Sequence, residues 1–164
     1  RLGQLTEECI IISNDVALYD FLGLPVYEDI FTGTGALAGV HSALTHATRP
    51  WVFVVACDMP FLNLTLLRWL FRQRGEADVV MPRRHGREEP LHAWYHRRVL
   101  PAVTAHLQSG HRRVISFLPD VRVTFVEEAA MRPLDPGLQS FSNANTPAEW
   151  QQVLAIWARQ PPDD

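Results

Sequence analysis

Trp51-Val-Phe-Val-Val-Ala-Cys-Asp-Met-Pro60 contains the clearest strand signal of the chain. Its first six residues are mainly aromatic or β-branched, and they are apolar without alternation, which is typical of a strand buried on both faces. Met59 and Pro60 end the strand, because proline cannot donate to a sheet ladder. We therefore expect Trp51–Ala56 to be the most buried strand of a sheet covered on both sides.

Strand and helix patterns alternate on either side of this strand. We expect strands over residues 9–13, 25–27, 77–81, 91–96 and 121–126, and helices over 15–22, 35–48, 63–74, 99–108, 114–118 and from Thr146 onward. A basic hairpin-like loop is expected over 82–89 and a frayed tail over 160–164. This order predicts one α/β domain over residues 1–164, with a doubly wound, mostly parallel sheet and helices on both faces, in the manner of a Rossmann-like three-layer fold.

Composition narrows the class of protein. The 164 residues are 47% hydrophobic and 20% charged with a net charge of −3, which indicates a folded domain and argues against a nucleic-acid groove. Cys9 and Cys57 do not form a disulfide framework, and no leader or membrane span is evident, so we expect a cytoplasmic protein. All basic residues are arginine. Neither a Walker-type lysine nor a Ser-His-Asp order occurs.

Asp58 is the first candidate site residue. It follows the most buried strand, and ligands of open α/β sheets bind at the carboxyl ends of strands. A carboxylate there suits Mg²⁺, which takes one or two protein carboxylates and fills its other positions with water and phosphates. The alternative is a helix cap, but Asn63 already serves the following helix.

Gly33-Thr-Gly35-Ala-Leu-Ala38-Gly39 precedes a helix and is the second candidate. Its first six residues match a dinucleotide fingerprint, which would place Asp58 on the ribose of NAD. The preceding strand is short and five residues distant, which argues against NAD. The glycines nevertheless present a helix N-terminus to an anion, or else form a tight loop that packs the helix against the sheet.

Asn143 and Asn145 stand two residues apart, just before a helix, so an extended backbone would aim both amides at one substrate. Asn145 serves equally well in the capping turn. His92 and His96 have the spacing of zinc ligands, but on a predicted strand this spacing is weak evidence for a zinc site. Arg112-Arg113 is a candidate phosphate clamp or a solvated helix face, and the loop 83–87 is a soluble tip that an anionic substrate would sense.

Five motifs in one order resemble those of the molybdenum cofactor guanylyltransferases. They are Gly35-Ala-Leu-Ala-Gly39, the strand into Cys57-Asp58-Met59-Pro60, Glu89-Pro-Leu-His-Ala-Trp-Tyr95, Ser109-Gly-His-Arg-Arg113 and Asn143-Ala-Asn-Thr-Pro147. The resemblance implies the fold of nucleotide-diphospho-sugar transferases. It also implies transfer of GMP from GTP to molybdopterin with Mg²⁺, with molybdoenzymes or their chaperones as further partners.

The resemblance also assigns roles to individual residues. Asp58 matches the family's magnesium aspartate, and Asn14 and Asp29 match positions on the nucleotide side. Gly35 and Gly39 belong to the nucleotide-binding motif, in which Ala36 replaces the usual proline. Asn143 and Asn145 match the motif that faces the pterin, and are taken with Asp58 as the catalytic set.

One departure concerns the phosphate loop. The family has a strand, a Leu-Ala-Gly-Gly loop, an arginine and a lysine ahead of the first motif, and residues 1–164 contain no such segment. We therefore expect the chain to lack an N-terminal β-loop-α unit, whose strand lies in the middle of the family's sheet, and the bare chain to be impaired.

Two alternative functions follow from the same residues. The chain could be a cytidylyl- or other nucleotidyltransferase of the same fold. It could also be a non-catalytic remnant that binds a partner or the finished cofactor through the segment around Asn143 and Asn145.

Overall fold

The computed structural model describes residues 2–158, and the tail expected over 160–164 lies outside them. The strands are β1 (Ile11–Ile12), β2 (Val26–Tyr27), β3 (Trp51–Val55), β4 (Val79–Arg84), β5 (Arg87–Glu88), β6 (His92–His96) and β7 (Val123–Glu127). The α-helices are α1 (Ala36–His46), α2 (Leu64–Arg72), α3 (Leu100–Gln108), α4 (Glu128–Met131) and α5 (Pro147–Trp157). Short 3₁₀ helices are η1 (Leu2–Gln4), η2 (Ala17–Leu22), η3 (Arg97–Val99), η4 (Leu118–Asp120) and η5 (Gln139–Phe141). Between residues 2 and 158, no helix combines the length and apolar character needed to cross a membrane.

The main sheet has the order β3-β6-β4, with β5 and β7 both paired to β4. Strands β3, β4 and β7 run in one direction, whereas β6 lies antiparallel to both β3 and β4. The sheet is therefore mixed. Among its described strands only β4 and β7 pair in parallel, and the expected mostly parallel pairing is interrupted by β6 and β5. The reason is the tight β4–β5 hairpin, where His85 and Gly86 take φ of 51° and 72° and send the chain back beside β4.

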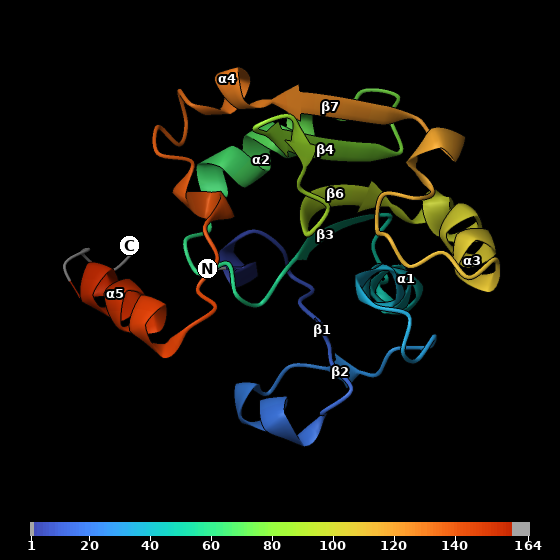
Figure 1. Ribbon diagram of the computed structural model, residues 1–164, viewed down its shortest axis with the longest axis horizontal. Helices are drawn as coiled ribbons and strands as arrows, with labels where there is room; N and C mark the ends of the chain where they lie inside the picture. The colour runs from blue at the N-terminus through green and yellow to red at the C-terminus, as the bar shows by residue number, and fades with distance from the viewer. Residues whose placement is uncertain (1, 159–164) are drawn as a thin grey trace.

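Helices cover both faces of this sheet (Figure 1). Val79 and Met81 of β4 pack in a core with α1 and α3, while Val80 between them packs in a second core with α2 and α4. Strand β6 repeats the pattern, with Ala93 and Tyr95 in the first core and Trp94 in the second. The expected three-layer α/β architecture is confirmed.

Helix starts follow the predicted caps. The Asn63 side chain accepts a hydrogen bond from the Leu66 amide at 3.0 Å, and Thr146 with Glu149 forms a complete capping box at α5. Several expectations differ. The expected helix over 15–22 is the 3₁₀ helix η2 (Ala17–Leu22), residues 114–117 are turns, and the expected loop 82–89 contains the end of β4 and all of β5.

The segment 9–13 differs most from its expected state. Only Ile11–Ile12 forms a strand, half-buried, which pairs in parallel with β2 in a separate two-stranded sheet. An open groove of about 690 Å³ lies between β1 and β3, with Gly39, Val40 and Ala43 of α1 along it. Within residues 2–158, β1 pairs only with β2 and β3 only with β6, so each strand has one edge without a ladder partner.

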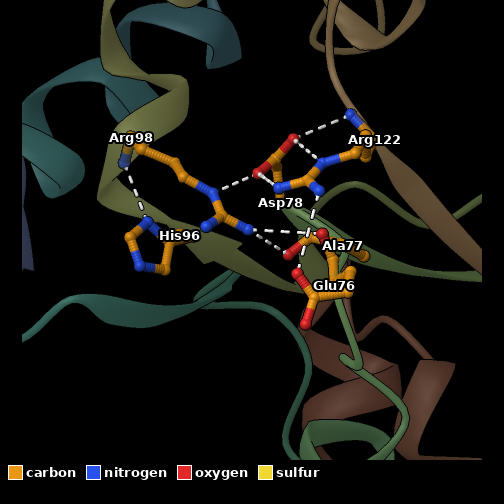
Figure 2. Close-up of polar contacts among 6 residues, drawn as sticks. All are labelled: Glu76, Ala77, Asp78, His96, Arg98 and Arg122. Carbon is orange, nitrogen blue, oxygen red and sulfur yellow. Dashed lines mark hydrogen bonds and ion pairs between the residues drawn. The ribbon is translucent and has the colours of Figure 1, made fainter.

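Asp78, directly before β4, connects this strand to Arg98 of η3 and to Arg122 just before β7 (Figure 2). Its carboxylate accepts hydrogen bonds from the Arg98 side chain and from the backbone amide of Arg122, at 2.9 Å for the amide. The Arg122 guanidinium adds two contacts at 3.3 Å. Burial alone would raise the pKa of Asp78, but the hydrogen bonds from Arg122 and Arg98 outweigh it and hold the pKa below its ordinary value.

We expect Asp78→Asn to lower the free energy of unfolding by about 2 kcal/mol at pH 7, because charge-assisted hydrogen bonds between strands are lost. A carboxyl whose folded pKa is depressed stabilises the fold above its unfolded pKa. This contribution is lost as the pH falls below about 4, through the folded pKa. Urea unfolding should therefore show the difference between wild type and variant shrinking between pH 7 and pH 3. The matched control is Asp20→Asn, at an exposed carboxylate. An equal loss in both variants would contradict the assignment.

Candidate active site

Asp58 lies in the turn that follows β3. The Ala56 amide still donates to the Leu91 carbonyl at 3.0 Å, and the Met59 amide then donates back to Ala56 at 3.2 Å, which closes the turn. Asp58 borders the groove between β1 and β3. Its Oδ1 atom is buried, yet no residue among 2–158 hydrogen-bonds to it. An unpartnered carboxylate oxygen at the end of a strand is chemically suited to bind a hard cation.

The segment with the two asparagines lies directly beside Asp58. The Ala144 amide donates to the Asp58 carbonyl at 2.8 Å, which ties two distant parts of the chain together. Ala144 is buried, whereas Asn143 and Asn145 on either side are exposed, which is the alternation of an extended backbone. The Asn145 amide donates to Glu149 at 2.7 Å, so its backbone belongs to the helix cap while its side chain is exposed.

Asn14 and Asp29 bind each other across fifteen positions of sequence. The Asn14 amide group donates to Asp29 Oδ2 at 3.1 Å, and the Asp29 backbone amide donates to Asn14 Oδ1 at 3.0 Å. Next to Asp29, the Ile30 amide donates to Ser42 of α1 at 2.9 Å. A Cβ atom on Gly39 would lie 3.9 Å from Asp29 Oδ1, another buried oxygen without a partner among residues 2–158. These contacts form a second cluster beside α1.

Gly35 begins α1 without a side-chain cap. Its φ of 77° and ψ of −161° are accessible essentially only to glycine. An exposed helix N-terminus of this kind attracts anions through its free amides and dipole. Beside it, Arg87, Arg112 and Arg113 line a recess of about 550 Å³, and in the described chain these three side chains make no ion pair or hydrogen bond. The recess therefore carries uncompensated positive charge.

The other two arginines of the loop 83–87 are paired with carboxylates. Arg83 pairs with Glu88 at 3.2 Å and with Glu127 at 3.5 Å, and Arg84 pairs with Glu89 at 3.0 Å. These pairs hold the β4–β5 hairpin. Of the loop 83–87, Arg87 is thus the arginine available to an anionic ligand.

The histidine pair of β6 does not form a metal site. His92 is fully buried, and His96 accepts a hydrogen bond from the Arg98 amide at 3.0 Å. No group of three or more His, Cys, Asp or Glu side chains is arranged to hold a metal in the part of the chain that the structure describes. A site that uses one carboxylate plus ligand phosphates remains compatible with Asp58.

A three-layer α/β fold with a carboxylate just after a strand and a glycine-started helix beside it is typical of nucleotide-binding α/β domains. The chain belongs to the MobA-like NTP transferase domain family, whose model matches residues 1–123. Its curated relatives are named molybdenum cofactor guanylyltransferases, which are nucleotidyltransferases. Membership of this family favours a nucleotidyltransferase role for the glycine segment over NAD binding.

Two relatives show the extent of the match. A probable molybdenum cofactor guanylyltransferase of Carboxydothermus hydrogenoformans is 34% identical over 96% of this chain and 80% of its own length. The enzyme of Desulfosudis oleivorans is 31% identical over 93% of this chain and 76% of its own.

Solved structures agree with this assignment. The crystal structure of molybdopterin-guanine dinucleotide biosynthesis protein A from Archaeoglobus fulgidus superposes with a TM-score of 0.76 at 27% identity. It covers 92% of this chain and 79% of that one. A 2-C-methyl-D-erythritol 4-phosphate cytidylyltransferase from Thermus thermophilus has a TM-score of 0.67 at 15% identity, over 95% of this chain and 85% of its own, and shows the shared fold alone.

We expect opposite stability effects from alanine at the two site glycines. Gly35→Ala should cost about 1–3 kcal/mol, because a side chain strains this backbone conformation. Gly39→Ala should be neutral or stabilise the protein by up to about 1 kcal/mol, because Gly39 is inside a helix and its new Cβ meets only ordinary contact distances. Urea unfolding of both variants tests this. Equal costs at the two positions would mean that Gly35 is not held in this conformation.

Proposed function

We propose that this protein transfers GMP from GTP to molybdopterin and releases pyrophosphate, and that efficient turnover needs the further strand argued for below. A phosphate oxygen of molybdopterin attacks the α-phosphorus of GTP, and the bond from that phosphorus to the pyrophosphate oxygen breaks. The hydrogen bond from Ala144 to the Asp58 carbonyl is the observation that carries the proposal. It joins a strand-end carboxylate to the exposed Asn143 and Asn145, so groups suited to GTP phosphates and to an acceptor are neighbours.

Asp58 fits the Mg²⁺ that the family implies. The buried Oδ1, which has no hydrogen-bond partner among residues 2–158, is a hard oxygen ligand, and those residues hold no group of three or more potential ligands that would make a closed metal cage. Asp58 would hold the ion together with phosphates of GTP. When bound, Mg²⁺ neutralises charge on the phosphates and on the departing pyrophosphate.

The remaining residues position the two substrates. We assign the Asn14–Asp29 cluster and Gly39 to the nucleoside side, as the family resemblance implies. Asn14 and Asp29 bind each other, and Asp29 Oδ1 lies 3.9 Å from the position that a Cβ of Gly39 would take. Backbone amides after Gly35 would face phosphate oxygens. The exposed amides of Asn143 and Asn145 would orient molybdopterin. Its terminal phosphate is largely dianionic at neutral pH, so no general base is required and positioning dominates catalysis.

The groove between β1 and β3 supports a further part of the proposal, which concerns the completeness of the sheet. Each of these strands has an edge without a ladder partner in the described residues, and α1 lies along the gap between them. We propose that one more strand completes the sheet there and brings the phosphate loop expected from the family resemblance. Residues 1–164 alone, which contain no lysine, should then turn over GTP poorly.

A turnover assay tests that part of the proposal. The 164-residue chain should form little pyrophosphate from GTP, molybdopterin and Mg²⁺, and a chimaera that carries a relative's glycine-rich loop ahead of residue 1 should form it readily. Turnover by the 164-residue chain at the chimaera's rate would refute the proposed completion of the sheet. No turnover by either protein would count against the guanylyltransferase function itself.

Nucleotide binding distinguishes the alternatives within this fold. GTP with Mg²⁺ should raise the melting temperature of the chimaera more than CTP or ATP does, since a ligand at a hundred times its Kd stabilises by about 2.7 kcal/mol. A larger shift with CTP would favour a cytidylyltransferase. No shift with any nucleotide, combined with binding of the finished cofactor, would favour the non-catalytic role.

Asp58→Asn in the active protein should lower Mg²⁺-dependent turnover more than about tenfold, because the charged ligand is lost while the turn is retained. The melting temperature should change little. Cys57→Ser is the control, since Cys57 shares the turn and is exposed. Activity of Asp58→Asn within tenfold of wild type would show that Asp58 does not bind the metal.

A further inference from the structure

His92 lies inside the protein, between β3, which leads to Asp58, and the segment that leads to Asn143. It pairs with Val55 in the β3–β6 ladder, three residues before Asp58, and none of its surface is exposed. Its ring meets Phe53 of β3 edge-on, with centroids 5.2 Å apart, and meets Phe141 with centroids 4.3 Å apart. His92 therefore touches the strand that ends at Asp58 and the segment that leads to Asn143.

A polar ring such as that of His92 is unusual at a fully buried position. Neither ring nitrogen has a hydrogen-bond partner within residues 2–158. Burial lowers the pKa of His92 to about 3, the charge of Asp135 opposing this and that of Arg84 adding to it, so the ring is neutral at physiological pH. An unsatisfied polar ring is less favourable in a core than an apolar one, and such local conflicts are concentrated at functional sites.

The segment that His92 contacts is held at two other points. Before Phe141, Asp135 accepts hydrogen bonds from the amides of Gln139 at 3.1 Å and Ser140 at 2.9 Å. After it, Ala144 donates to the Asp58 carbonyl. Phe141 is the buried side chain between these two points, and His92 is the ring packed against it from β6. A substitution of His92 would therefore alter the packing of Phe141 and, through it, the position of Asn143.

We propose that His92 is a positioning residue, which sets the place of the Asn143–Asn145 segment relative to Asp58 by packing between Phe53 and Phe141. The assignment rests on the proposed function, in which that segment orients the acceptor. In this role His92 contacts neither substrate, and its substitution should affect the binding of molybdopterin, the acceptor. The Asn14–Asp29 cluster on the nucleoside side belongs to other elements and should not respond.

Two readouts on the protein in its GMP-transferring form test this role. In His92→Ala, hydrogen exchange at the Ala144 amide should become about tenfold faster, because its bond to Asp58 opens more often. The KM for molybdopterin should rise about tenfold with the KM for GTP changed less than about twofold. His92→Phe keeps the ring contacts and should restore both values. His92→Leu gives the same exchange measurement if the alanine variant does not fold.

Leu107→Ala is the matched control, because Leu107 is buried in the core on the other face of the sheet. It should destabilise the protein without changing Ala144 exchange selectively. Equal acceleration in Leu107→Ala, or unchanged exchange in His92→Ala, would overturn the role of His92 whatever the activity. Absence of GMP transfer by the unaltered protein would instead overturn the proposed function. The exchange rates at Ala144 would still show whether His92 positions the segment.

Discussion

Burial of both faces of β4 and β6 is the constraint on which the rest of the structure depends. Consecutive residues of each strand enter opposite cores, Val79 and Met81 on one side and Val80 on the other. A slip of one residue would exchange the two sets and pack every side chain against the wrong helices. The register of β6 against β3 is thereby fixed, which determines where β3 ends and where Asp58 emerges from the sheet.

The sheet determines where Asp58 lies, but the candidate site as a whole is assembled by contacts between segments that are distant in sequence. One backbone hydrogen bond places the Asn143–Asn145 segment at the end of β3, and one reciprocal side-chain pair fixes Asn14 to Asp29. Asp58 in the turn after β3 and Gly39 on α1 border the same groove. The carboxylate is thus held directly behind a strand and the glycine within a helix, while loops carry the amides, an arrangement suited to binding two substrates side by side.

Much of the fold could be predicted from local signals. Asn63 and the Thr146–Glu149 box marked helix starts correctly, and the apolar run at Trp51 marked a strand followed by Asp58. The antiparallel place of β6 was missed, because a hairpin turn reveals a reversal but not which neighbour the returning strand joins. The bond between Ala144 and Asp58 has no local signal. Nor does the burial of His92, whose spacing from His96 is that of zinc ligands but is weak evidence for a metal site on a predicted strand.

The free edge of β3 has a consequence for the behaviour of the chain in solution. Trp51–Val55 is a five-residue, wholly apolar strand, and in the described chain only β6 occupies one of its edges. Natural sheets protect such edges with charge, proline or a covering segment, and none of the five residues is charged or proline. Copies of residues 1–164 at high concentration should therefore self-associate edge to edge, and a peptide that occupies the groove should keep them dispersed.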